Sequence, residues 1–150
     1  MQLSDDELSP TLESDLYSHP GYLIRRAHQI SVANFHDRFG RGVTPVQYAA
    51  LRAVHDSPGM DQLSLAQKIA LDPTTTAGIA SRLEDKGWLL REILPRRQRK
   101  LSLTEAGEDY LKQLMPGVAA VKYSVFAKMG KEDSEEFLRL LRKFVEVNSL

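Results

Sequence analysis

A dense cationic run is the clearest candidate for chemistry in this chain. Arg96-Arg97-Gln98-Arg99-Lys100 carries four positive charges in five residues, although the formal net charge of the whole chain is zero. Guanidinium and ammonium groups at this density attract phosphates, because each phosphate that they neutralise releases condensed counterions. The run therefore predicts a surface for a nucleic-acid backbone. A solvated charged tip without a ligand is the alternative.

Two apolar segments flank this run and predict the hairpin that presents it. Residues 87–94 precede it and residues 101–103 follow it, so a strand, a basic tip and a returning strand form a β-hairpin. Alternation along a hairpin would place Arg97 and Arg99 on one side and Arg96 on the other. We expect one or two of these side chains in the minor groove of duplex DNA and the rest on phosphates.

Upstream of the hairpin, two helices separated by a tight break predict a helix-turn-helix. Ser64 is expected to cap the first helix, whereas Asp72 caps and Pro73 opens the second, which Gly87 ends in the left-handed conformation. In this motif the second helix meets base edges in the major groove, and a helix start favours a phosphate. The residues expected to bind DNA are Ser64, Gln67, Thr74, Thr75, Gly78, Arg82, Arg96, Arg97 and Arg99.

Longer helices are expected on both sides of this unit. They cover Pro20 to about Phe39, Pro45 to about Asp56 after the cap Thr44, Glu105 to about Met129 with an interruption at Pro116 and Gly117, and Lys131 to Val147. The helices at the two ends carry apolar stripes that a monomer would expose, and pairing with a second copy would bury them. The alternative is that these helices pack only on one another.

These elements define the expected fold class and domain organisation. We expect a mainly α (α+β) fold, a winged helix-turn-helix with N- and C-terminal helices that form a homodimerisation lobe. Residues 1–18 would form a mobile acidic arm, residues 19–42 and 104–150 the dimerisation helices, and residues 43–103 the DNA-binding lobe.

Composition excludes several function classes. The 150 residues are 42% apolar and 27% charged, as in ordinary globular proteins. The lack of cysteine excludes a thiol nucleophile and a cysteine zinc site. No phosphate-binding glycine loop, His-Glu-x-x-His motif or serine elbow occurs, so we expect no enzyme, no catalytic residue, no metal and no cofactor. Without a membrane span or secretory signal, we expect a cytoplasmic protein that joins the nucleoid when bound to DNA.

Several segments, in this order and spacing, together resemble the MarR family of bacterial transcriptional regulators. The resemblance covers about His19 to Val147 and depends on residues 43–48, 74–89 and 101–107. Residues 21–28 and 96–104 are similar to the branch that controls the catabolism of nicotinic acid and other aromatic acids, the NicR and BpsR branch.

The hairpin tip departs from the pattern of that family. The family carries Asp-x-Arg there, and while Arg97 matches the arginine, Pro95 occupies the position of the aspartate. This departure leaves open a second function, a winged-helix protein-interaction module without DNA binding.

The resemblance implies a repressor that binds a pseudo-palindromic operator on double-stranded DNA as a homodimer. A small aromatic acid effector, such as 6-hydroxynicotinic acid, would release it. Such a ligand needs a cation, an apolar slot and a hydrogen-bond donor. His19, Tyr22 and Arg26 share one face of the first helix, and Tyr48 and His55 share one face of the next, so we expect these five residues to bind the effector. Alternatively, they lie at core edges with their polar tips in water.

Overall fold

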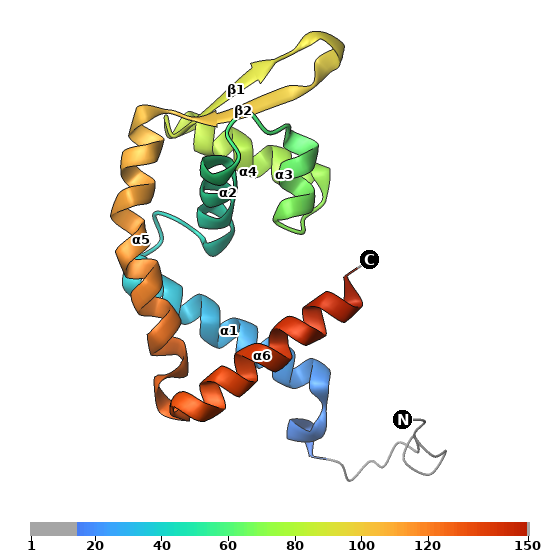
Figure 1. The fold of residues 1–150 in the computed structure, drawn as a ribbon, viewed down its shortest axis with the longest axis vertical. Coiled ribbons are helices and arrows are strands. Elements are labelled where there is room, and N and C mark those ends of the chain that lie inside the picture. The colour runs from blue at the N-terminus through green and yellow to red at the C-terminus, as the bar shows by residue number, and fades with distance from the viewer. Residues whose placement is uncertain (1–14, 150) are drawn as a thin grey trace.

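A computed structural model describes residues 15–149 of the chain (Figure 1). In chain order the elements are a 3-10 turn at Leu16–Ser18, α1 at Pro20–Phe39, α2 at Pro45–Asp56, α3 at Gln62–Lys68, α4 at Pro73–Asp85, β1 at Leu89–Ile93, a 3-10 turn at Pro95–Arg97, β2 at Arg99–Leu103, α5 at Glu105–Phe126, a 3-10 turn at Ala127–Met129 and α6 at Lys131–Asn148. The expected acidic arm, residues 1–18, lies outside the described residues except for its last four.

Local capping explains where α2 and α4 begin. Thr44 and Gln47 form the expected reciprocal capping box, with the Gln47 N–H donating to Thr44 Oγ1 at 3.1 Å. Asp72 caps α4 and Pro73 takes its first position, as expected. Beyond the end of α4, Gly87 adopts a φ of +79°, which glycine tolerates best.

The start of α3 corrects one expectation. Asp61, not Ser64, is the N-cap, and Ser64 is the third residue of the helix, with its N–H donating to Asp61 Oδ1 at 2.8 Å. Both residues are good caps, and the earlier one prevails because its neighbours pair with the hairpin. Met60 accepts a backbone hydrogen bond from Leu101, and Asp61 forms a β-bridge with Lys100.

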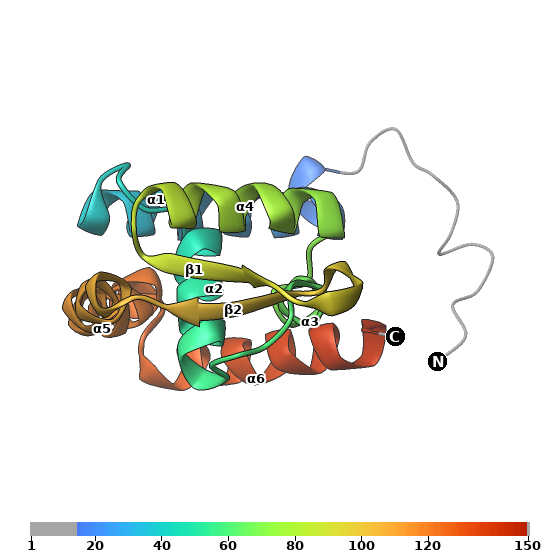
Figure 2. The same cartoon turned by 90° about the horizontal axis from the view of Figure 1, so that it is seen from above.

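Residues 43–103, which we call the winged lobe, enclose the main core together with the first turns of α5. Figure 2 shows α2 beneath the hairpin, with α4 running alongside it. The buried side chains come from all three helices and both strands of the lobe: Ala50, Leu51, Ala53, Val54, Leu65, Ile79, Ala80, Leu83, Leu89, Leu101 and, from α5, Leu111. This core fixes α4 and the hairpin relative to each other.

The hairpin is short and its tip is a defined turn. β1 and β2 are antiparallel, from Leu89 opposite Leu103 to Ile93 opposite Arg99. The Leu94 N–H donates to the carbonyl of Gln98 at 2.7 Å, and Arg96 between them has a φ of +72°. The alternation expected from Arg96 to Lys100 is therefore wrong, because Arg96 and Arg97 belong to the turn and β2 begins only at Arg99.

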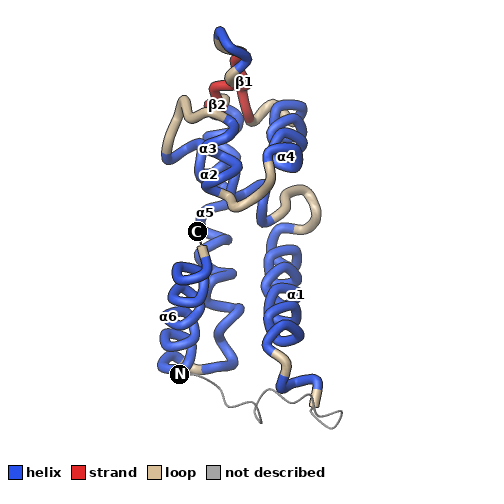
Figure 3. The backbone as a smooth tube through the Cα atoms, turned by 90° about the vertical axis from the view of Figure 1, so that its right-hand side faces the viewer, coloured by secondary structure: helices blue, strands red, loops and turns tan. Residues whose placement is uncertain are grey.

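The terminal helices extend away from the winged lobe (Figure 3). The C-terminal part of α1 packs on α5 through a second core of Phe35, Val43 and Leu114. The interruption expected at Pro116 and Gly117 does not divide the helix, since α5 continues through both residues. Gly117 instead allows close packing, because a Cβ there would lie 2.7 Å from the Phe39 ring.

Helix α6 leaves its apolar stripe uncovered in the protomer. Among its described residues none is buried, although its sequence is strongly amphipathic. The exposed members of the stripe are Phe137, Leu140, Leu141, Phe144 and Val145. Of the helices within residues 15–149, none has both the length and the apolar character needed to cross a membrane.

Candidate nucleic-acid interface

The two faces of α4 differ in the way a DNA-reading helix requires. Its buried face consists of Thr76, Ile79, Ala80 and Leu83, and its exposed face includes Thr74, Thr75, Gly78 and Arg82. A Cβ on Gly78 would meet nothing within 4 Å, so no other part of the described chain covers this face. The exposed face of α4 is thus free for a partner.

A carboxylate of the protein, that of Asp61, already accepts hydrogen bonds at the start of α3. The N–H and the hydroxyl of Ser64 both donate to the Asp61 carboxylate, at 2.8 Å each. These hydrogen bonds keep the pKa of Asp61 below its ordinary value. Ser64 is half-buried, whereas Gln67 is exposed. Of the two residues expected to bind a phosphate here, Gln67 has the more accessible side chain.

The start of α4 repeats this arrangement on a more exposed surface. Thr75 donates its N–H to Asp72 Oδ1 at 2.8 Å and its hydroxyl to Asp72 Oδ2 at 2.6 Å. The hydroxyl bond is the main reason that the pKa of Asp72 lies below its ordinary value. Sequence reasoning recognised Asp72 only as a cap. The Asp-x-x-Ser/Thr spacing, present at both helix starts, was the signal for the second bond.

An ion pair that sequence reasoning missed fixes the hairpin of residues 89–103, which we call the wing, to α4. Arg91 Nη2 lies 3.1 Å from Glu84 Oε1, and only 13% of the Arg91 side chain is exposed. Hydrogen bonding from Arg91 lowers the pKa of Glu84. Arg91 is two residues beyond the buried Leu89 and therefore shares its face of β1, which was the available signal.

The wing presents its cations to solvent beyond this anchor. Arg96 and Arg99 are both exposed, and Lys100 on β2 is exposed beside them. The hairpin projects from the lobe on the same side as α4 begins (Figures 1 and 2). The tip that carries these cations therefore lies at the end of the lobe where the first turn of α4 is exposed.

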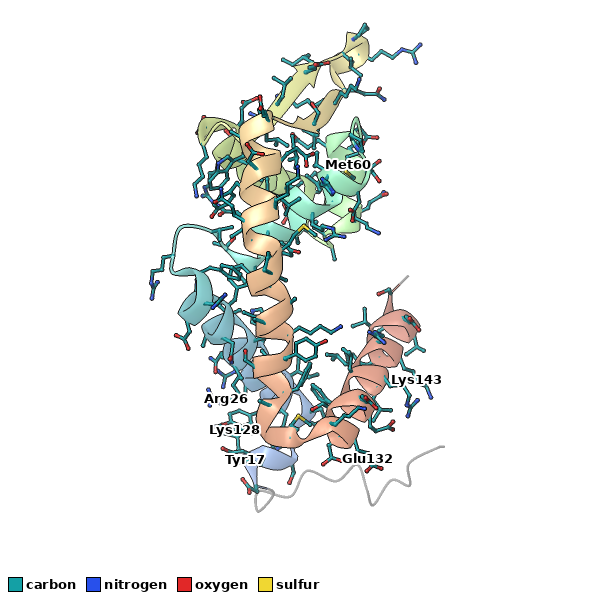
Figure 4. The ribbon with its side chains drawn as sticks, turned by 60° about the vertical axis from the view of Figure 1, so that its left-hand side comes forward. Tyr17, Arg26, Met60, Lys128, Glu132 and Lys143 are labelled. Atoms are coloured by element: carbon teal, nitrogen blue, oxygen red, sulfur yellow. The ribbon has the colours of Figure 1, made fainter. Side chains whose placement is uncertain are left out.

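Three of the residues expected to bind the effector lie at the start of α1. His19 is its N-cap residue. The Tyr22 ring contacts the ring of Tyr17 edge-on. The guanidinium of Arg25 lies 5.4 Å from the centre of the Tyr22 ring. Arg26 donates to Gln29 at 2.8 Å. Figure 4 places Arg26 at the end of the molecule that carries Tyr17, far from the winged lobe.

The other two expected effector residues lie on α2. Tyr48 is half-buried and packs against both cores. His55 Nδ1 lies 2.7 Å from Glu108 Oε2 of α5, and just over a third of each side chain is exposed. Within one protomer the structure therefore separates the α1 group from the α2 group (Figure 1).

Comparison with known proteins connects this geometry to a family. The sequence pattern of the MarR family matches residues 43–101, which span α2 to β2. The chain is 32% identical over 105 residues to the transcriptional regulator HosA of Escherichia coli O111:H−, which covers 69% of this chain and 78% of HosA. It is 27% identical over 135 residues to the HTH-type transcriptional repressor NicR of Pseudomonas putida, over 88% of this chain and 85% of NicR.

A solved structure shares both the fold and the arrangement of its elements. BpsR of Bordetella bronchiseptica, whose DNA binding is regulated by 6-hydroxynicotinic acid, superimposes with a TM-score of 0.82 at 25% identity. The match covers 89% of this chain and 98% of BpsR, so it includes the terminal helices as well as the winged lobe.

Proposed function

Because this chain belongs to the MarR family, and is a transcriptional regulator and not an enzyme, we propose that it is a ligand-responsive repressor. It binds a pseudo-palindromic operator as a homodimer, and a small aromatic carboxylate releases it. The expected winged helix-turn-helix fold and the likeness to NicR and BpsR are confirmed. The observation that carries the proposal is the uncovered polar face of α4 together with the exposed wing cations.

Each protomer contacts DNA through two elements. α4 enters the major groove with Thr74, Thr75 and Gly78, and Arg82, farther along the helix, meets a phosphate. Arg96, Arg97 and Arg99 of the wing reach the minor groove and its phosphates, where the potential is negative. The Arg91–Glu84 pair supports this division, because it fixes the angle between wing and helix.

The homodimer is supported by the apolar stripe of α6. A stripe of five large side chains in water is unfavourable, and a two-fold partner is the simplest way to cover it. Two winged lobes related by a two-fold axis then read two half-sites about one helical turn apart. The operator is therefore roughly palindromic.

The effector acts by population shift between dimer forms. An aromatic acid is supported by BpsR, whose DNA binding responds to 6-hydroxynicotinic acid. One protomer separates His19, Tyr22 and Arg26 from Tyr48 and His55, so an effector that touches both groups would have to bind where two protomers meet. A ligand that favours a spacing of the two α4 helices unsuited to the operator weakens DNA binding by its differential affinity.

The proposal is tested by measuring the affinity of the protein for duplex DNA from the region upstream of its own gene at several salt concentrations. Replacing Arg96 and Arg99 together by Ala lowers the affinity by orders of magnitude and reduces the slope of log affinity against log salt by about two. Arg52→Ala, which removes an exposed arginine of α2, is the matched control and leaves the slope unchanged. A protein that binds no duplex at low ionic strength contradicts the proposal and indicates an interaction module instead.

The effector is tested separately on the same DNA. Titration with 6-hydroxynicotinic acid and related aromatic acids raises the apparent Kd of the wild type. An affinity unchanged across that series removes the effector from the proposal but leaves DNA binding intact.

A further inference from the structure

Two exposed side chains at the start of α4, Asp72 and Thr75, present hydrogen-bond acceptors. A free threonine hydroxyl can both donate and accept, but the proton of the Thr75 hydroxyl is directed at Asp72 Oδ2, 2.6 Å away. The Thr75 oxygen keeps only lone pairs for a partner. Asp72 uses one acceptor position on each oxygen for Thr75 and keeps the others, and both side chains are exposed.

The carboxylate remains ionised at neutral pH, so it offers no proton of its own. Its hydrogen bonds with Thr75 keep the pKa of Asp72 below the ordinary value for aspartate. Asp72 and Thr75 together therefore form a fixed patch of acceptors at the end of α4 that approaches the base edges.

Bases differ in what they present to such a patch. Adenine N6 and cytosine N4 carry amino groups that donate in the major groove, whereas guanine O6 and N7 and thymine O4 only accept. An acceptor patch thus forms hydrogen bonds with adenine or cytosine and leaves two unpaired acceptors face to face with guanine or thymine.

We propose that Asp72, held by Thr75, determines operator specificity by selecting a base with an exocyclic amino group, adenine or cytosine, at one position of each half-site. This inference rests on the proposed binding of an operator through α4. Asp72 contacts the base itself, and through its hydrogen bond with Thr75 it also fixes the direction of the Thr75 hydroxyl.

The negative charge of Asp72 sharpens this selection. On a duplex without a matching amino group, the carboxylate approaches phosphates and base acceptors with nothing to compensate its desolvation. Asp72 therefore weakens binding to unrelated DNA while it supports binding to the operator. Removal of the charge raises the affinity for random duplex.

The N-terminus of α3 has the same arrangement of a capping aspartate and a hydroxyl donor, and it supplies a matched control. Asp61 holds Ser64 as Asp72 holds Thr75, with bonds of the same length to the backbone N–H. Asp61, however, caps the helix that precedes the reading helix, and it is half-buried beside β2. Substitution at Asp61 therefore changes a capping carboxylate without changing the base-reading surface.

Selection from a duplex pool with randomised positions tests the proposal with Asp72→Asn. Asparagine caps a helix as well as aspartate does, but it replaces one acceptor by an amino donor. Thr75 then accepts from that amino group, and its own hydroxyl proton becomes available. The wild type enriches adenine or cytosine at one position of each half-site. Asp72→Asn shifts that position toward guanine or thymine by roughly tenfold in relative affinity, and Asp61→Asn keeps the wild-type preference.

The outcomes separate this inference from the proposed function. A wild type that enriches no sequence refutes operator binding itself. A wild type with a defined operator whose base preferences are the same in Asp72→Asn overturns the inference alone. If thermal unfolding shows that Asp72→Asn does not fold, Asp72→Ser decides, because serine also caps but both donates and accepts. The wild-type preference then falls by roughly tenfold if the inference holds and is unchanged if it does not.

Discussion

The winged lobe and α6 bury their apolar side chains in opposite ways. In the lobe, Leu51 and Leu101 are fully buried and Leu83 is 1% exposed. On α6, Phe144 is 51% and Val145 is 54% exposed, although both belong to one continuous stripe. The lobe therefore closes its core within one chain, whereas the stripe of α6 stays exposed and is the proposed dimer interface.

Helix α5 connects these two regions and shares both properties. Leu111, near its start, is buried in the core of the lobe, and Phe126, at its end, contacts only Phe137 of α6 among the ring systems of the described chain. A groove of about 640 Å³ separates α5 from α6, lined by Tyr123 and Leu138 among others. The core of the lobe is complete within one protomer once the first turns of α5 are included, whereas the proposed second copy would cover the groove and the stripe.

The largest effect is expected from a charge in the stripe of α6. Phe144→Glu places a carboxylate in the proposed dimer interface, where its burial without a partner is unfavourable. Sedimentation equilibrium should then show a single subunit of 16.9 kDa. Operator affinity should fall on the order of a hundredfold or more, because two linked half-sites are no longer bound together.

Lys143→Glu is the control for this substitution. Lys143 is the neighbour of Phe144 on the same helix and points to solvent in Figure 4. The substitution Lys143→Glu introduces the same glutamate side chain outside the stripe, so the dimer should persist. A wild type that sediments as a single subunit would contradict the comparison between the two regions.

A smaller effect is expected from a substitution in the core of the lobe. Unlike a substitution in the α6 stripe, it should change the free energy of unfolding by an amount that does not depend on protein concentration. Leu51→Ala should lower the free energy of unfolding of the lobe by about 2–5 kcal/mol, as for other fully buried leucines. The chain's one tryptophan, Trp88, stacks on Tyr110 with ring centres 3.9 Å apart and reports this transition by fluorescence. Urea unfolding should give the same loss at low and at high protein concentration.

Leu140→Ala gives the opposite behaviour. Leu140 is 47% exposed in the protomer and belongs to the α6 stripe. Its truncation should leave the Trp88 transition of the dissociated protein in place and raise the dissociation constant of the dimer. Equal and concentration-independent losses from Leu51→Ala and Leu140→Ala would show that α6 packs within its own chain.

Sequence predicted best what neighbouring residues determine. The first residues of α1 and α2 follow from Pro20 and from the capping box of Thr44, because these residues act within one helical turn. At α3 two caps compete three residues apart. Asp61 becomes the cap because residues 59–61 pair with β2, about forty residues away in the sequence. A pattern of neighbouring residues cannot predict that contact.

In the candidate site, too, features set by neighbouring residues could be predicted from the sequence, and contacts between distant residues could not. The charges of the wing and the polar face of α4 could be predicted, because composition and helical period determine them. Alternation along β1 indicates that Arg91 faces inward, but the partners of the ion pairs could not be predicted, since Arg91 meets Glu84 across a turn and His55 meets Glu108 of another helix. These contacts depend on how the helices pack, and they decide which side chains remain free for a ligand.

The smallest effect is expected at the turn between α3 and α4. Ala70 adopts a φ of +56°, a left-handed conformation that costs an alanine about 1 kcal/mol and a glycine little. Ala70 is exposed, so the substitution removes no core contact. Ala70→Gly should therefore raise the free energy of unfolding by roughly 0.5–1 kcal/mol, which a shift in the urea midpoint of the Trp88 fluorescence measures.

Ala77→Gly reverses the sign of that change within the same motif. Ala77 lies in the interior of α4, where glycine is about 1 kcal/mol less favourable than alanine. Neither substitution touches α6, so the dissociation constant of the dimer should stay the same in both variants. A loss of stability in Ala70→Gly would mean that the turn carries no strain. A change in dimerisation would mean that the winged lobe and the terminal helices are coupled, and that the lobe is not the self-contained unit that its core suggests.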